Sequence, residues 1–177
     1  MADDSPTPDH MVAITLEDLL VFEAIKRVKY AYVRCLDQKR WDEMVALFTP
    51  DATASYSGGK YQYEGAEEIV GFMRRNMDRP AFHTSHRMHH PEITLIGPDE
   101  AVATWAMEDH NVDDEWDFYL TGAGFYEDRY RKVDGTWLIA HTGYKRTFET
   151  IMPLSAGGRT LTASWWGTDG RSTLDVQ

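Results

Sequence analysis

Apolar residues recur at helical spacing in the first part of the chain. Thr15 and Asp18 have the spacing of a capping box, which predicts that a helix begins there. Its apolar positions, three or four residues apart, are Leu20, Ala24, Ile25, Val28, Tyr32 and Leu36. Two more helices are predicted at 41–48 and 65–77, with short strands at 53–56 and 60–63 between them.

From residue 86 onward, the pattern changes to the alternation that is typical of strands. Strands are predicted at 86–96, 101–112, 118–133 and 136–148, and the last two meet at Asp134-Gly135, a strong hairpin signal. Helices followed by a long antiparallel sheet indicate the α+β class. We therefore expect a cone-shaped, barrel-like fold in which three N-terminal helices pack on a curved, mainly antiparallel sheet and enclose a cavity.

The length of 177 residues predicts one domain with additional segments at its ends. Residues 1–13 contain Pro and Asp and are expected to be a disordered tail, whereas 14–149 should form the domain. The extension 150–177 contains Trp165 and Trp166, so we expect it to pack on the domain or on a neighbouring subunit.

Charge and cysteine content restrict the partners and the compartment. A net charge of −11 argues against binding to nucleic acid or an anionic membrane, both of which require a basic surface. The acidic start of the chain does not resemble a secretory signal, and no apolar run is long enough to span a bilayer. Since Cys35 is the only cysteine, no internal disulfide can form, and a cytoplasmic protein is expected.

Four of the seven histidines lie within the stretch HTSHRMHH at 83–90. A zinc site would need three or four convergent ligands, but in a strand His86 and His90 share one face and His89 lies on the other. The spacing alone therefore leaves three interpretations open: a metal site, a catalytic base with peripheral histidines, or a polar surface turn.

Three other polar residues have an ordinary structural interpretation beside a functional one. In the 101–112 strand, Asp109 ends an apolar face, either at the strand's solvated end, which parity alone slightly favours, or held in a cavity by a partner. Taken alone, Tyr32 is more often a core residue than a catalyst. Asp37, where the first helix ends, is more often a cap for the helix that begins at Trp41.

Several segments resemble the SnoaL-like branch of the nuclear transport factor 2-like superfamily, which includes scytalone dehydratase, ketosteroid isomerase and polyketide cyclases. Within it, the nearest resemblance is to the bile-acid 7α-dehydratases, over about residues 22–149. The segments are YVRCLDQKRWDEMVALFTPDATASYSGG, HRMHHPEITLIG, ATWAMEDHN and GAGFYEDRYRKVDGTWLIAHTGYKRTFE. One fold hosts many functions, so the resemblance does not determine the substrate.

Position by position, the resemblance implies functional roles for Tyr32, Asp37, His86, Asp109 and Arg146, and the scytalone dehydratase pattern adds Tyr56. His86 would be the general base, and Asp109 would orient its ring and stabilise the imidazolium. Tyr32 would donate a hydrogen bond to the dienolate, while Arg146 would bind a substrate carboxylate or pair with Asp37.

The implied activity is that of a cofactor-independent dehydratase without a metal. It would eliminate water from a small hydrophobic substrate, a hydroxylated cyclic ketone of steroid, bile-acid or polyketide type, and the protein would be a homotrimer or homodimer. A ketosteroid isomerase or a cyclase could use the same pocket. Outside catalysis, the alternatives are a subunit like the small subunits of ring-hydroxylating dioxygenases, or a ligand-binding protein.

Overall fold

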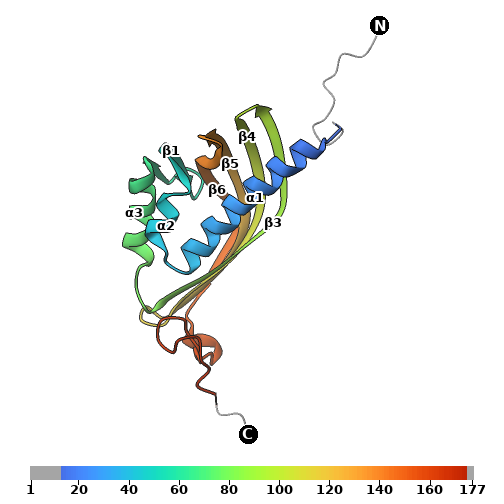
Figure 1. The fold of residues 1–177 in the computed structure, drawn as a ribbon. Helices are drawn as coiled ribbons and strands as arrows, with labels where there is room; N and C mark the ends of the chain where they lie inside the picture. Colours follow the sequence, from blue (N-terminus) through green and yellow to red (C-terminus); the bar gives the residue numbers. More distant parts are fainter. Residues whose placement is uncertain (1–12, 175–177) are drawn as a thin grey trace.

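The computed structural model describes residues 13–174 and shows three α-helices packed on one curved, six-stranded sheet (Figure 1). The α+β prediction is confirmed, and the sheet is mixed and does not close into a barrel. The elements are α1 (Leu16–Asp37), α2 (Trp41–Val45), β1 (Phe48–Tyr56), β2 (Tyr61–Glu64), α3 (Ala66–Met77), β3 (Phe82–Gly97), β4 (Glu100–Asp113), β5 (Phe118–Val133), β6 (Thr136–Met152) and the short 3₁₀ helix η2 (Ser155–Gly157).

The sheet has the strand order β2-β1-β6-β5-β4-β3. Strands β3 to β6 form an antiparallel meander of long strands, and β1 joins β6 in parallel. At the β5–β6 turn, Asp134 and Gly135 have φ angles of 49° and 81°, so the predicted hairpin turn is confirmed. Figure 1 shows the long strands curving around α1.

Helix α1 begins as its sequence predicts. The Thr15 hydroxyl accepts from the Asp18 amide at 3.1 Å, and the Asp18 carboxylate accepts from the Thr15 amide at 2.8 Å, which completes the capping box. The face toward the sheet carries the buried residues Ile25, Tyr32 and Leu36. Leu20, which the periodicity places in the same apolar stripe, is exposed.

Several predicted boundaries are wrong. Strand β1 begins at Phe48, five residues earlier than expected, and β6 continues to Met152, beyond the expected end at 148. The helix expected at 41–48 ends at Val45, because the carbonyl of Leu47 accepts a hydrogen bond from the amide of Ile139 on β6 and Phe48 already belongs to β1. Strand β3 begins at Phe82, four residues earlier than expected, so that all four clustered histidines lie on it.

Two irregularities change which side chains face the cavity. In β3, the register shifts between His89 and Glu92, and His90 has a φ of 44° and is exposed, so it does not share a face with His86 as the alternation predicts. In the β5–β6 pair, the register shifts between Ala123 and Gly124, which leaves one extra residue on β6. Beyond that point, inward and outward positions on β6 are exchanged.

A buried ion pair connects α1 to the sheet. The Lys29 ammonium lies 2.8 Å from the Asp128 carboxylate, and both side chains are inaccessible to solvent. Asp128 also accepts hydrogen bonds from Tyr130 and Thr142, both at 2.8 Å. Burial lowers the pKa of Lys29, although the Asp128 charge opposes that shift.

The C-terminal extension touches the domain but leaves one tryptophan in solvent. After β6, Ser155 donates to the Asp117 carboxylate, and farther on the Lys39 ammonium lies 4.7 Å from the centre of the Trp166 ring. Trp165 is exposed. Most of the predicted N-terminal tail, residues 1–12, lies outside the described residues. Among those described, no helix combines the length and apolar character needed to cross a bilayer.

Candidate active site

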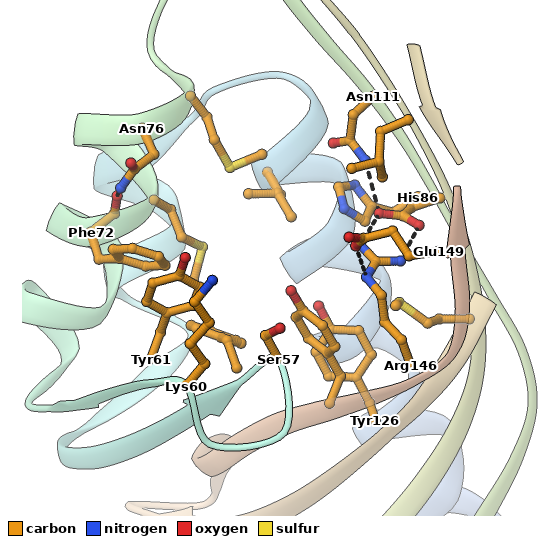
Figure 2. A pocket seen from close by; sticks show the side chains of 18 of the residues that line it. Ser57, Lys60, Tyr61, Phe72, Asn76, His86, Asn111, Tyr126, Arg146 and Glu149 are labelled. Carbon is orange, nitrogen blue, oxygen red and sulfur yellow. Dashed lines mark hydrogen bonds and ion pairs between the residues drawn. The ribbon is translucent and has the colours of Figure 1, made fainter. Parts of the chain in front are cut away.

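A cavity of about 340 Å³ lies between the helices and the concave face of the sheet (Figure 2). Side chains of α1, α3 and all the strands of the meander line it, and this volume is within the range of small-molecule sites. One wall is mainly aromatic and aliphatic, whereas ionisable groups gather on the other.

His86 is held by Asp37, the last residue of α1. The His86 ring Nδ1 lies 2.7 Å from Asp37 Oδ1, the His86 amide donates to Oδ2 at 2.9 Å, and the Thr84 hydroxyl donates to Oδ1 at 2.8 Å. Three contacts therefore determine the position of the carboxylate. Since Nδ1 is engaged, Nε2 remains as the nitrogen that can act on a molecule in the cavity.

Asp37 is a carboxylate at the C-terminal end of a helix, where the dipole disfavours negative charge. Burial by itself would raise its pKa, but the hydrogen bonds from His86 and Thr84 outweigh that effect and bring the pKa below its ordinary value of 3.8. Asp37 is thus ionised at neutral pH. The suggested capping of the helix at Trp41 is wrong, since α2 has Arg40 at its N-cap and no side-chain capping bond.

Asp109 lies inside the fold, 2% exposed, and not at a solvated strand end. Both of its oxygens accept from Arg146, Oδ1 from Nη1 and Oδ2 from Nη2 at 2.7 Å each, and Oδ2 also accepts from the Asn111 amide at 2.9 Å. Burial would raise the pKa of Asp109, but Arg146 and Asn111 lower it below 3.8.

The partners expected for two site residues are therefore exchanged. His86 and Asp109 stand directly opposite each other on β3 and β4, but the carboxylate that orients the His86 ring is Asp37. Arg146, for which Asp37 was one expected partner, forms its bidentate pair with Asp109. The reason is geometric: the helix end brings Asp37 to the backbone and ring of His86, whereas Arg146 reaches Asp109 across β5.

Local backbone features place Arg146 at this position. Its Nε lies 2.6 Å from the Glu149 carboxylate. Because Thr147 is an extra residue in β6, Glu149 faces inward and Phe148 faces outward. Gly122 on β5 provides the space for the guanidinium, because a Cβ there would lie 2.5 Å from Arg146 Nη1. Despite burial, which favours the neutral form, the Asp109 contacts raise the pKa of Arg146.

Two phenols face the cavity on the side of α1. The hydroxyls of Tyr32 and Tyr56 lie 3.3 Å apart, and both residues are buried. Burial first, and then the neighbouring phenols, raises the pKa of each well above 10.0, so both remain protonated donors at neutral pH. The Lys29 ammonium lies 3.5 Å from the ring centre of Tyr126, another lining residue.

The other clustered histidines do not line the cavity. His83 lies near Asp114 at 4.0 Å, and burial lowers its pKa. Within residues 13–174, no three His, Cys, Asp or Glu side chains come together as a metal-binding group. The six residues singled out by sequence are all at the cavity or bonded to its lining. Sequence patterns missed three residues at or behind the lining: Glu149, Asn111 and Lys29. Helical spacing could have placed Lys29 on the buried face of α1, because it is in phase with Ile25, Tyr32 and Leu36.

Comparisons with known proteins show the family and the fold. The model of the SnoaL-like domain matches residues 17–143. A curated relative, the probable cyclase FGR4 of Gibberella zeae, is 24% identical over 140 residues, which cover 72% of this chain and 92% of the relative.

Two similar solved structures show the same fold. A candidate scytalone dehydratase from Novosphingobium aromaticivorans has a TM-score of 0.71 and 23% identity, with 77% of this chain and 91% of that chain covered. A hexachlorocyclohexane dehydrochlorinase from Novosphingobium barchaimii has a TM-score of 0.71 and 17% identity, with 82% and 97% covered. At these identities, the likeness shows the fold and not the reaction.

Proposed function

The chain belongs to the SnoaL-like family, and from this premise we propose that it is a cofactor-independent lyase that eliminates water from a hydroxylated cyclic ketone of steroid or polyketide type. The observation that carries the proposal is the pairing of His86 with Asp37 at 2.7 Å beside a cavity of small-molecule size. A carboxylate that holds one imidazole nitrogen leaves the other as a general base.

The reaction needs a proton to leave carbon and a hydroxyl group to leave as water. In a substrate whose hydroxyl is conjugated to the ketone through an enone, Nε2 of neutral His86 would take the proton that the conjugated carbonyl makes acidic, and the electron pair of that C–H bond would form a dienolate. The electrons then return to form the new double bond as the C–O bond breaks, and the imidazolium supplies its proton to the departing oxygen. Asp37 stabilises the imidazolium between these steps, because it lies at Nδ1 and is ionised.

The dienolate oxygen requires hydrogen-bond donors in a site that excludes water. Tyr32 and Tyr56 suit this role, since their hydroxyls are buried beside the cavity and remain protonated. Neutral phenols stabilise a developing negative charge more than they stabilise the ketone, which favours the transition state over the ground state.

A second candidate is a cyclase that uses the same base, which the relative named as a cyclase favours. A cyclase would also remove a proton next to a carbonyl, but the resulting enolate would attack a second carbonyl in the same molecule. The two reactions differ in product, because elimination removes one water from a preformed ring, whereas cyclisation first forms a carbon–carbon bond.

The purified protein can be tested against a panel of hydroxylated cyclic ketones, with product absorbance and mass as readouts. We expect His86→Ala to lower kcat by about 10²- to 10⁴-fold, the usual contribution of general base catalysis. Asp37→Asn should also lower kcat, and His86→Ala with Asp37→Asn should be little worse than His86→Ala, because the two residues act as one unit.

The matched control is His110→Ala, which removes an imidazole that is bonded to Tyr119 outside the cavity. Its kcat should equal that of the unaltered protein. Equal activity of the His86→Ala and unaltered proteins on every substrate that is turned over would contradict the proposal. A new carbon–carbon bond in the product would favour the cyclase.

A further inference from the structure

The charged wall of the cavity consists of Asp109, Arg146, Glu149 and Asn111. We infer that it accepts the hydroxyl of an uncharged substrate and excludes carboxylates from the inner part of the site. This inference rests on the proposed function and specifies its substrate class as a neutral cyclic hydroxyketone. The arginine at the centre of the wall would ordinarily suggest the opposite, an anion receptor.

Arg146 is already occupied by the protein's own carboxylates. Nη1 and Nη2 each donate to Asp109 at 2.7 Å, and Nε lies 2.6 Å from Glu149. Its guanidinium lies 5.3 Å from the centre of the Tyr144 ring. A substrate carboxylate would have to displace a bidentate pair whose side chains are only 15% and 3% exposed, and the displaced Asp109 would be left buried without its partner.

The balance of charge around the cavity also opposes an anion. Three carboxylates, Asp37, Asp109 and Glu149, lie on or directly behind the lining, against the guanidinium of Arg146. Behind the lining residue Tyr126, Lys29 and Asp128 form a pair without net charge. Among the described lining residues, the other formal cation is Lys60, which is exposed, as is Glu149. An entering carboxylate would lose hydration in a site whose cations are already balanced by carboxylates, with a small negative excess.

The same wall is suited to hydroxyl groups. Asp109 and Glu149 offer carboxylate oxygens, and the Asn111 amide, which donates to Asp109 through its nitrogen, has its carbonyl oxygen as an acceptor. The opposite side offers the donors Tyr32 and Tyr56. A molecule that presents a carbonyl to the phenols and a hydroxyl to the carboxylates complements both sides without any charge.

The test compares equilibrium binding of two rigid probes of almost equal shape, 2-acetylnaphthalene and 2-naphthoate, to the full chain by calorimetry at neutral pH. Neither probe can eliminate water, so binding is measured without turnover. We expect the neutral ketone to bind at least about tenfold more tightly, since one unfavourable charge contact in a partly buried site corresponds to that much or more. Equal or tighter binding of 2-naphthoate, or no binding of either probe, would overturn the inference.

A variant that removes one charge tests whether the charged wall causes the preference for the neutral ketone. Glu149→Gln removes one carboxylate from Arg146 and should reduce the preference for the ketone severalfold, mainly through tighter binding of 2-naphthoate. Glu127→Gln is the matched control, because Glu127 pairs with Lys145 at the surface, both side chains being well exposed, and does not line the cavity. The same change in both variants would overturn the inference.

These results are separable from those on the reaction itself. A protein that prefers the ketone but turns over no substrate would retain this inference and fail the proposed function. A protein that eliminates water but binds both probes equally would retain the function and fail this inference.

Discussion

The buried pair of Lys29 and Asp128 allows a quantitative prediction of stability. Lys29→Met removes the ammonium but leaves an aliphatic side chain of similar length against the Tyr126 ring. The Asp128 carboxylate, fully buried, then has only the Tyr130 and Thr142 hydroxyls as partners. Removal of one member of a buried ion pair leaves an uncompensated charge in the interior, so we expect a large loss of stability.

The magnitude follows from the contacts that remain. Loss of one partner from a buried pair costs about 3–5 kcal/mol of stability. Because Asp128 retains two charge-assisted hydrogen bonds from hydroxyls, we expect Lys29→Met to lower the free energy of unfolding by about 3 kcal/mol, the lower end of that range. Asp128→Asn should cost a similar amount, because it leaves Lys29 without its counter-charge. The double variant buries no charge, and its amide oxygen can still accept a hydroxyl, so its loss should be about 2 kcal/mol and not the sum of about 6.

The free energy of unfolding of the unaltered protein, the two single variants and the double variant can be measured by urea unfolding followed by tryptophan fluorescence, with linear extrapolation to zero urea. Should either single variant fail to fold, recovery of folding in the double variant would give the same answer. The exposed pair Lys145 and Glu127 is the control, and Lys145→Met should change stability little. Additive losses in the double variant would refute the reasoning, because they would mean that the two charges do not depend on each other.

Three further results are expected. Gly122→Ala should lower the free energy of unfolding in urea by about 1–3 kcal/mol, since the new Cβ would lie 2.8 Å from the Phe148 carbonyl oxygen and 2.5 Å from the Arg146 guanidinium. The control Gly71→Ala, in α3, should leave the stability unchanged or increase it. The pKa values of Asp37 and Asp109 are lower in the folded protein than their ordinary value of 3.8, so both carboxylates stabilise the fold above pH 3.8. This stabilisation is lost as the pH falls through the lowered pKa values. Asp37→Asn should therefore make the free energy of unfolding depend less on pH in the acid range. Light scattering should give a dimer or trimer and not a 20.3 kDa monomer, and Phe148→Glu, at an exposed apolar position, should shift the protein toward monomer.

Periodicity and turn chemistry predicted most of the fold. The capping box of α1 and the Asp134-Gly135 turn depend on neighbours in sequence, and the structure confirms both. Patterns of this kind act locally, so a single sequence is enough to recognise them. The solvated strand end that parity slightly favoured for Asp109 is wrong, because the buried face of β4 continues through Asn111 to Asp113.

The pairing of site residues could not be obtained in this way. The family resemblance implies that His86 and Asp109 face the same cavity, but it does not say which of several inward groups form a hydrogen bond. That choice depends on where α1 ends relative to β3, because the helix end places Asp37 against His86. The irregularity near His90 was missed for a related reason, since a bulge exchanges the two faces of a strand and leaves the composition unchanged.

The extra residue on β6 couples two surfaces that would otherwise vary independently. It turns Glu149 toward Arg146 and Phe148 toward the outside of the sheet. Insertion of one residue between Ala123 and Gly124 would give Thr147 a partner on β5 and restore the simple alternation of β6, which would place a phenyl ring beside the guanidinium and a carboxylate on the outer face. In a lineage of such proteins, the gain of one codon in β5 could therefore change the molecule that the cavity accepts and the surface offered to a neighbouring subunit in the same step.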